Sequence, residues 1–219
     1  MPAVAAPKAA PAPVASVAGN QHIGGHVELV AASGQRLDAA EAAGIVAYYV
    51  PIDGAPKPKP GSYSIVMRGK RFDPAVLVVP VGSTIAFPNQ DEILHNVFSV
   101  SPKATFDLGL YGEGKSAETT FDSATLVQVF CNVHHSMHAD ILVLSTPWFT
   151  RVAANGDFRL DGLPAGSGTL YFWHPRAGSL SREVNVPGDA PVSEKLLATK
   201  PVIPEHRRKD GESYRPTQP

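Results

Sequence analysis

The stretch Cys131-x-x-His134-x-x-Met137 constrains this chain more than any other, because it groups a thiol, an imidazole and a thioether and contains the only cysteine. It directly follows residues 126–130, an apolar and β-branched run that predicts a strand ending where the stretch begins. We therefore expect the three side chains on one loop, close enough together to surround one ion. His95, on another loop between two predicted strands, offers a second imidazole.

A thiolate, two imidazoles and a weak axial thioether form the ligand set of a copper electron-transfer site. We therefore expect one type 1 (blue) copper site, cycling between Cu⁺ and Cu²⁺, made by His95, Cys131, His134 and Met137. Zinc fits less well, since Met is a poor zinc ligand and structural zinc sites usually contain more cysteines. The alternative without a metal is a buried structural cysteine beside surface histidines.

The composition favours many short strands separated by turns. Of 219 residues, 21 are Pro and 19 are Gly, and 18% are charged. Short apolar runs between such turns recur from residue 64 to residue 144, which predicts an all-β sandwich with the ligand loops at one end. The formal net charge of −1 provides no field that would attract nucleic acid. A single cysteine excludes an intramolecular disulfide bond.

The two ends of the chain differ from the interior. Residues 1–21 are rich in Ala and Pro and are expected to form a disordered tether. Their prolines interrupt any apolar helix, so this is not an intact signal peptide, while removal of one from a longer precursor stays open. Residues 200–219 are polar and are expected to form a disordered tail. No apolar run reaches the roughly 20 residues that cross a bilayer, so no transmembrane segment is expected.

Several motifs surround the expected ligands. They are Phe72-Asp73-Pro74, Val81-Gly82-Ser83, Phe87-Pro88-Asn89-Gln90-Asp91, His95-Asn96-Val97-Phe98-Ser99 and Cys131-x-x-His134-x-x-Met137. On these motifs residues 72–144 resemble the plastocyanin/amicyanin group of the cupredoxin family, and the short spacing from His134 to Met137 is similar to that of amicyanin. One departure is Ser123-Ala124-Thr125, which replaces the usual Pro-Gly turn before the cysteine strand and affects no ligand.

The resemblance implies an eight-stranded Greek-key β-sandwich, here over residues 62–147. It also implies that His95 and His134 bind copper through imidazole nitrogen, Cys131 through its thiolate and Met137 axially. Asn96 would brace the ligand loop, and His134 would lie near the surface as the electron port.

The other histidines carry weaker expectations. His135 and His138 are expected to titrate in solvent, with tuning of the site or docking of a partner as the alternative. His138 is also a rival to Met137 as axial ligand. His22 and His26 have the spacing of a helical metal pair, but they lie where a linker and a strand are expected.

Residues 109–116, Gly-Leu-Tyr-Gly-Glu-Gly-Lys-Ser, match the phosphate-binding pattern G-x-x-x-x-G-K-[ST]. That mechanism needs a buried strand before the loop and a helix after it. Residues 105–108 predict only a weak strand, and residues 117–121 favour a strand over a helix. We therefore expect no nucleotide and interpret the motif as a loop of the same sandwich.

A second module is indicated by Asn155-Gly156-Asp157-Phe158, Leu163-Pro164-Ala165-Gly166 and Trp173-His174. These resemble the later half of carboxypeptidase-regulatory-like (transthyretin-like) modules, and residues 25–27 and 46–50 resemble the opening half. We therefore expect residues 22–52 and 148–199 to form a second small β-sandwich, split by the cupredoxin domain. The alternative is a single elaborated cupredoxin followed by a separate C-terminal sandwich.

Together these features favour a one-electron carrier between redox partners. A lone mononuclear site lacks the further copper ions that oxygen reduction needs, so no enzyme is expected. The resemblance implies a redox protein as partner, such as a dehydrogenase or cytochrome c, and a periplasmic or otherwise extracytoplasmic location. The alternatives are a copper-binding or copper-handling module without electron shuttling, and a metal-free adhesion or carbohydrate-binding sandwich.

Overall fold

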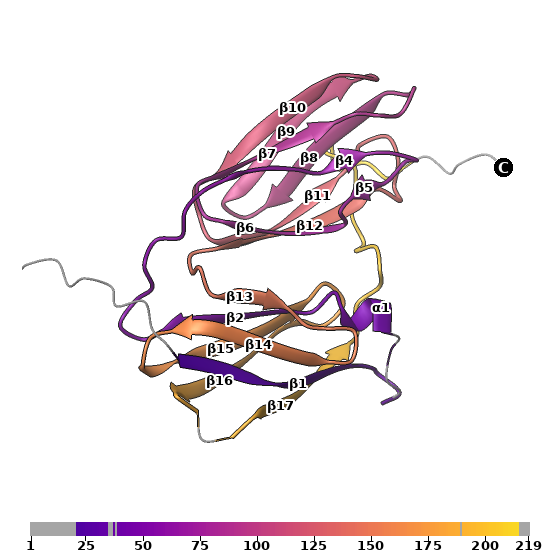
Figure 1. Cartoon of the computed structure of the whole chain (residues 1–219). Helices are drawn as coiled ribbons and strands as arrows, with labels where there is room; N and C mark the ends of the chain where they lie inside the picture. The colour runs from indigo at the N-terminus through magenta and orange to yellow at the C-terminus, as the bar shows by residue number, and fades with distance from the viewer. Residues whose placement is uncertain (1–20, 35–36, 38, 189, 215–219) are drawn as a thin grey trace, which may run out of the picture.

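The chain forms two stacked β-sandwiches. The computed structural model describes residues 21–34, 37, 39–188 and 190–214. Strands dominate this part of the chain, which confirms the expected all-β fold class. In Figure 1 the upper lobe is made by residues 62–144, here called the first sandwich. The lower lobe, here called the second sandwich, is made by residues 21–51 and 149–198.

The first sandwich places a five-stranded sheet, in the order β6-β12-β11-β8-β9, against a three-stranded sheet, in the order β10-β7-β3. In β7 every second residue is buried, and Ile85 and Phe87 are fully enclosed. This alternation arises because successive side chains of a strand point to opposite faces. The strands of this sandwich are β3 (Ser62–Ser64), β4 (Val66–Met67), β5 (Phe72–Asp73), β6 (Val76–Pro80), β7 (Ser83–Pro88), β8 (His95–Ser101), β9 (Ala104–Tyr111), β10 (Ser116–Phe121), β11 (Thr125–Phe130) and β12 (His138–Leu144).

Strand β12 is buried on both faces. Ile141 and Val143 belong to the core of the first sandwich. Leu142 instead packs in a separate apolar cluster with Trp173, which comes from the second sandwich. A strand covered on both faces is expected to contain a continuous apolar run, and residues 141–144 of β12 form one. The two sandwiches are therefore joined by a small apolar contact in addition to the connecting chain.

The second sandwich joins strands from both ends of the described chain. β1 (Gln21–Ala31) pairs antiparallel with β14 and parallel with β17. β2 (Val46–Pro51) pairs antiparallel with β13 and β15. These pairings place residues that precede the first sandwich beside residues that follow it. The other elements are α1 (Ala39–Ala42), β13 (Phe149–Arg151), β14 (Asp157–Leu163), β15 (Gly166–His174), β16 (Gly178–Val186) and β17 (Val192–Ala198).

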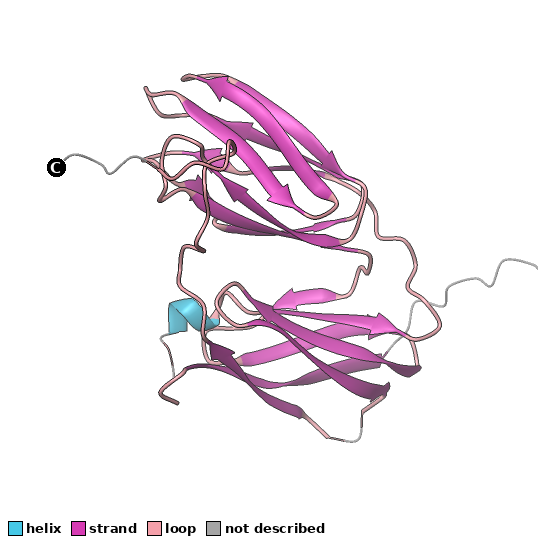
Figure 2. Ribbon diagram, turned by 180° about the vertical axis from the view of Figure 1, so that it is seen from behind, coloured by secondary structure: helices cyan, strands magenta, loops and turns pink. Residues whose placement is uncertain are grey.

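The described part of the C-terminal segment, residues 200–214, contains turns but no strand or helix. Residues 200–214 leave the second sandwich after β17 and run back along the first sandwich, as the yellow segment of Figure 1 shows. Figure 2 shows the same connection from behind. Residues 215–219, and residues 1–20 of the expected N-terminal tether, lie outside the described residues. Within the described part no helix is long and apolar enough to cross a membrane.

Candidate metal centre

Two neighbouring strands bring His95 and Cys131 to the same end of the five-stranded sheet. β8 begins at His95, and Cys131 follows Phe130, the last residue of β11. Phe130 pairs with Phe98 of β8. Because the two strands are antiparallel, the start of one lies near the end of the other. His134 lies on the same loop as Cys131, between β11 and β12, and completes the group.

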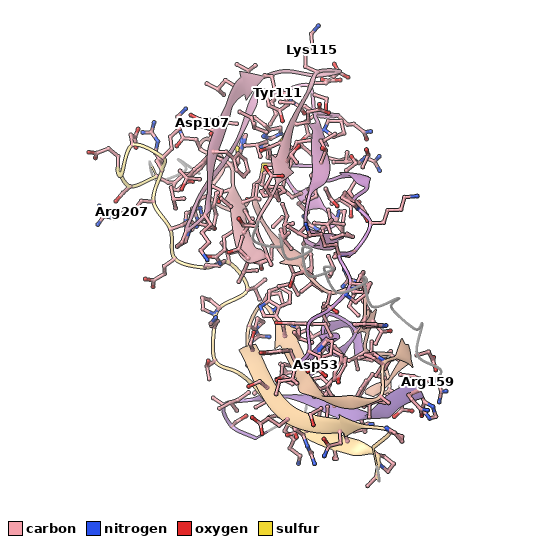
Figure 3. All side chains as sticks on the ribbon, turned by 90° about the vertical axis from the view of Figure 1, so that its left-hand side faces the viewer. Asp53, Asp107, Tyr111, Lys115, Arg159 and Arg207 are labelled. Carbon is pink, nitrogen blue, oxygen red and sulfur yellow. The ribbon has the colours of Figure 1, made fainter. Side chains whose placement is uncertain are left out.

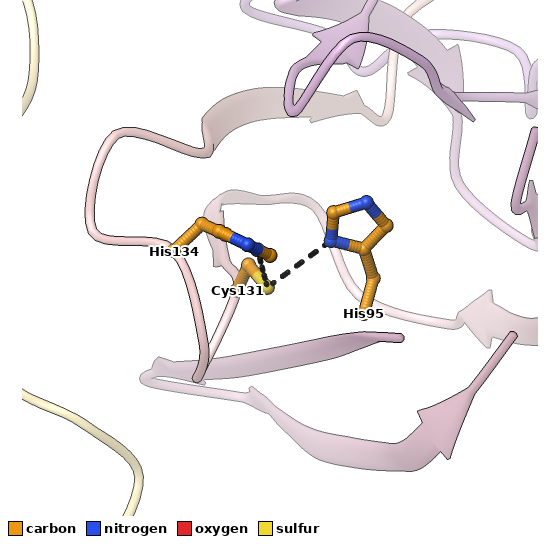
Figure 4. Close-up of side chains that lie close together, drawn as sticks. All are labelled: His95, Cys131 and His134. Atoms are coloured by element: carbon orange, nitrogen blue, oxygen red, sulfur yellow. Dashed lines mark hydrogen bonds between the residues drawn. The ribbon is translucent and has the colours of Figure 1, made fainter. Parts of the chain in front are cut away.

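The side chains of His95, Cys131 and His134 converge, as Figure 4 shows. The Sγ atom of Cys131 lies 3.7 Å from Nδ1 of His95 and 3.8 Å from Nδ1 of His134. The ligand atoms of the three residues all lie within 4.8 Å of one another. In the described part of the chain no other three His, Cys, Asp or Glu residues meet this spacing.

These separations fit a common metal ion. Metal–sulfur and metal–nitrogen bonds of about 2.3 Å and about 2.05 Å, meeting at about 120°, separate sulfur from nitrogen by about 3.8 Å. Both sulfur–nitrogen distances in the protein agree with this value. The donor set, one thiol and two imidazoles, is the one that trigonal copper sites use. The residues present therefore fit a copper ion.

Burial differs among the three side chains. Cys131 and His95 are fully buried, whereas His134 is partly exposed. Desolvation, followed by the neighbouring His95, holds the pKa of His134 below its usual range. The imidazole of His134 is therefore neutral at neutral pH, which leaves a nitrogen lone pair for a metal. The burial of Cys131 also excludes a role as a nucleophile toward a substrate from solution, because its sulfur is inaccessible.

Met137 is fully buried in the same apolar core as Cys131. The backbone N–H of Met137 donates to the carbonyl of His134 at 3.0 Å, and the N–H of Cys131 donates to the carbonyl of Met137 at 3.3 Å. The ligand loop therefore closes on itself, with its three candidate ligands on one compact turn.

Asp91 holds the ring of His95, and the sequence interpretation assigned it no role. Its Oδ2 atom lies 2.8 Å from Nε2 of His95. The backbone N–H of Gly69 donates to Oδ1 of Asp91 at 2.6 Å, and that of Lys70 donates to Oδ2 at 2.9 Å. Gly69 and Lys70 have φ values of 60° and 57°, so this turn directs successive N–H groups toward one carboxylate.

The same contacts determine the charge of Asp91. Partial desolvation opposes ionisation, but hydrogen bonds from Lys70, His95 and Gly69 outweigh it and lower the pKa of Asp91 below its usual value. The ionised carboxylate of Asp91 accepts a hydrogen bond from Nε2–H of His95, so the ring hydrogen stays on Nε2 and Nδ1 is left unprotonated, facing Cys131. This is the outer partner that metal-binding histidines commonly have.

Asn96 braces a different segment from the one expected. Its amide nitrogen donates to Oδ1 of Asp107 at 2.7 Å and to the carbonyl of Gly109 at 2.8 Å. The Asn96 side chain therefore fastens the end of β9 beside His95, rather than the Cys131 loop. The reason is the antiparallel pairing of β8 with β9, which places Asn96 opposite Leu110.

The remaining histidines lie outside the group of three. His135 stacks on His206 at a centroid distance of 4.6 Å. His138 lies in β12 with Nε2 3.4 Å from Oδ1 of Asp140. His26 hydrogen-bonds with Asp157 in the second sandwich, so the i, i+4 pair with His22 forms no helical site.

The phosphate-binding pattern of residues 109–116 falls on a hairpin. It covers the end of β9, a turn and the first residue of β10. A strand, not a helix, follows the turn, so the backbone geometry that the motif needs is absent from these residues.

No protein-family model matches the chain, and no curated protein matches it. Similar solved structures include a Cu(I) form of an amicyanin variant, 20% identical, over 38% of this chain and 82% of amicyanin, with a TM-score of 0.36. A purple cupredoxin from Nitrosopumilus maritimus is 20% identical over 37% of this chain and 99% of its own, with a TM-score of 0.35. A copper-containing nitrite reductase from Thermus scotoductus is 26% identical over 53% of this chain and 28% of its own, with a TM-score of 0.36.

Proposed function

We propose that His95, Cys131, His134 and Met137 bind one type 1 copper ion and that the protein carries single electrons between redox partners. The observation that supports this most is the pair of sulfur–nitrogen distances, 3.7 and 3.8 Å, around a buried cysteine. His95 reaches its position from the start of β8, and Cys131 and His134 reach theirs from the loop after β11.

A bound copper ion would supply a centre that accepts and releases one electron. The protein's part is to keep the ligands still while this happens. Asp91 holds His95, the end of β11 holds Cys131, and the closed turn of the ligand loop holds Met137. Ligands that are fixed by packing and hydrogen bonds need little movement when the charge changes, so the barrier to transfer stays low.

The electron would enter and leave by way of His134. Its imidazole is the partly exposed member of the group, and the neighbouring Val133 is 48% exposed. A partner that docks over Val133 and His134 comes close to a partly exposed ligand, whereas His95 and Cys131 are buried beneath the surface. By the resemblance already stated, the partner is a redox protein such as a dehydrogenase or cytochrome c, and the location is extracytoplasmic.

We also propose that the protein is a carrier rather than an enzyme. The candidate centre contains one group of three ligand residues, and its thiol is fully buried. Such a site offers an electron path through His134 but no space at the sulfur for a substrate.

The test is copper reconstitution of the whole protein. We expect an intense visible thiolate-to-copper absorption band and a reversible one-electron wave in voltammetry. Cys131→Ala should abolish the band, while Ser136→Ala, on the exposed part of the same loop, should keep it. Colour retained by Cys131→Ala would overturn the ligand assignment. A colourless copper adduct of the unaltered protein would favour copper handling, and no copper uptake would favour a metal-free binding sandwich.

The domain division is a proposal that the strand pairings support. We propose that residues 22–52 and 148–199 form one module and residues 62–147 another. The pairing of β2 with β13 and β15 supports the split arrangement, as do the separate apolar cores of the two sandwiches.

A further inference from the structure

The segment of residues 201–214, here called the C-terminal strap, connects the second sandwich to the candidate metal centre. It is anchored at its start by Arg176, whose carbonyl accepts the backbone N–H groups of Thr199 and Lys200. From there it runs to the first sandwich along the side on which Figure 3 labels Arg207 and Asp107. The strap contains no regular strand or helix, so its contacts with the first sandwich decide its position.

Tyr214 contacts the cysteine residue itself. Its hydroxyl donates a hydrogen bond to the backbone carbonyl of Cys131 at 2.8 Å. A phenolic hydroxyl is a hydrogen-bond donor, so Tyr214 holds the loop at the backbone of the cysteine and leaves its sulfur free for a metal.

Lys209 contacts the residue after Cys131 and is linked through Asp107 to the residue after His95. Its backbone N–H donates to Oδ1 of Asn132 at 2.8 Å, and Asn132 directly follows Cys131. Its Nζ atom lies 2.5 Å from Oδ2 of Asp107. Asp107 in turn accepts the amide of Asn96, the residue directly after His95. One residue of the strap is therefore linked to the two strand ends that carry His95 and Cys131.

His206 adds an aromatic contact to the same loop. Its ring stacks on Phe130 at a centroid distance of 4.0 Å and on His135 at 4.6 Å. Phe130 directly precedes Cys131, and His135 directly follows His134. The strap thus contacts the residue before Cys131, the carbonyl of Cys131 and the residue after it.

The strap presents Lys209 on a closed turn. The N–H of Arg208 donates to the carbonyl of Glu212 at 3.0 Å, and the N–H of Gly211 donates to the carbonyl of Arg208 at 2.9 Å. Gly211 has a φ of 82°, in the region that favours glycine. A turn closed by its own hydrogen bonds loses little further freedom when Lys209 binds the loop.

We propose that the C-terminal strap is part of the metal centre, with Tyr214 and Lys209 as positioning residues that hold the Cys131 loop in its ligand-binding geometry. The inference deepens the proposed function and rests on it, because the strap acts on the same copper site. It also makes the geometry of that site depend on the second sandwich, which anchors the strap. The strap restrains the loop from outside, while the loop's own hydrogen bonds and the packing of Cys131 and Met137 in the core restrain it from inside. The loop geometry, and with it the reduction potential of bound copper, then depends on a segment that the second sandwich anchors.

The experiment compares full-length variants with and without copper. In the metal-free protein, Tyr214→Phe should speed hydrogen exchange at the backbone amides of Cys131 and Met137 by about fivefold, the factor that one typical hydrogen bond contributes. In the copper-loaded protein, Tyr214→Phe and Lys209→Met should each weaken copper binding by about tenfold. This is the lower end of the loss of metal affinity that follows when a residue supporting a metal ligand is replaced. Both should also shift the reduction potential and the position of the visible band.

The matched control is Tyr171→Phe, at a tyrosine in β15 of the second sandwich whose ring stacks on Tyr48. It should leave all these quantities unchanged. Unchanged amide exchange, copper affinity and potential in both strap variants would overturn the inference, even with a blue unaltered protein. A colourless unaltered protein would instead contradict the proposed function, and the amide exchange of the metal-free variants would still decide whether the strap holds the loop.

Discussion

The Nε2 atom of His95 lies 2.8 Å from Oδ2 of Asp91, in a buried position from which Nδ1 faces the Cys131 sulfur. The carboxylate fixes the tautomer, because a hydrogen on Nε2 leaves the lone pair on Nδ1. It also places a negative charge beside a candidate metal ligand. Both consequences can be tested by substitution.

Replacing Asp91 by Asn should raise the reduction potential of the copper-loaded protein. The amide oxygen can still accept from His95, but the negative charge that favours Cu²⁺ over Cu⁺ is lost. We expect Cu²⁺ to bind about tenfold more weakly relative to Cu⁺, which corresponds to about 59 mV for a one-electron couple. Voltammetry measures this shift. Glu92→Gln removes a charge at the exposed neighbouring position and should change the potential much less; equal shifts in both variants would refute a specific role for Asp91.

Replacing Met137 by Leu should keep the visible band and raise the reduction potential. The band requires the thiolate and the imidazoles, whereas the axial ligand tunes the potential. A swap of similar volume in a packed core should cost less than about 1.5 kcal/mol of unfolding free energy. Met67→Leu, another fully buried methionine of the same core, is the control. If both variants show the same potential as the unaltered protein, Met137 is not an axial ligand.

The contact between the sandwiches should contribute measurably to stability. Leu142 is 6% exposed and packs in the cluster that includes Trp173. Leu142→Ala should lower the free energy of unfolding by about 2–4 kcal/mol, since it leaves a cavity in this contact. Denaturant titration measures the change. Leu110→Ala, at a residue that is 59% exposed, should change it by less than about 0.5 kcal/mol, and a similarly small effect for Leu142 would mean that the contact is loose.

Acid should remove the contribution of Asp107. Partial burial opposes its ionisation, but hydrogen bonds from Lys209, Asn96 and Gly109 lower the pKa of Asp107 below the usual value. A carboxyl with a lowered pKa in the folded protein stabilises it above the unfolded pKa of about 3.9, and this contribution is lost as pH falls through the folded pKa. Asp107→Asn should therefore be less stable than the unaltered protein at pH 6, with the difference vanishing in acid. Denaturant titrations across pH measure it.

The control for the acid prediction is Asp122→Asn, at an exposed aspartate of the first sandwich. Its stability should follow that of the unaltered protein at every pH. A difference between Asp107→Asn and the unaltered protein that persists unchanged into acid would show that the lost contact, rather than the ionised carboxylate, causes the effect.

The metal centre was predictable as far as it depends on local sequence. Cys131, His134 and Met137 share one loop because their spacing follows directly from the chain, and the apolar run before them forms β11 as expected. His95 was predicted from its place between two strands and by resemblance. The all-β class followed in the same way from Pro, Gly and alternating apolar residues, which act over a few positions.

The tertiary structure alone decided the partners of these residues. Asp91 reaches His95 only because the turn at Gly69 and Lys70, which joins β4 to β5, holds its carboxylate. Tyr214 reaches Cys131 only because β17 ends near Arg176 and directs the chain back to the first sandwich. The polar sequence of residues 200–219 favoured disorder, because it offers little apolar surface to bury. Spacing along a chain determines which ligands can share a loop, whereas hydrogen bonds between segments far apart in sequence depend on how the strands pair and pack.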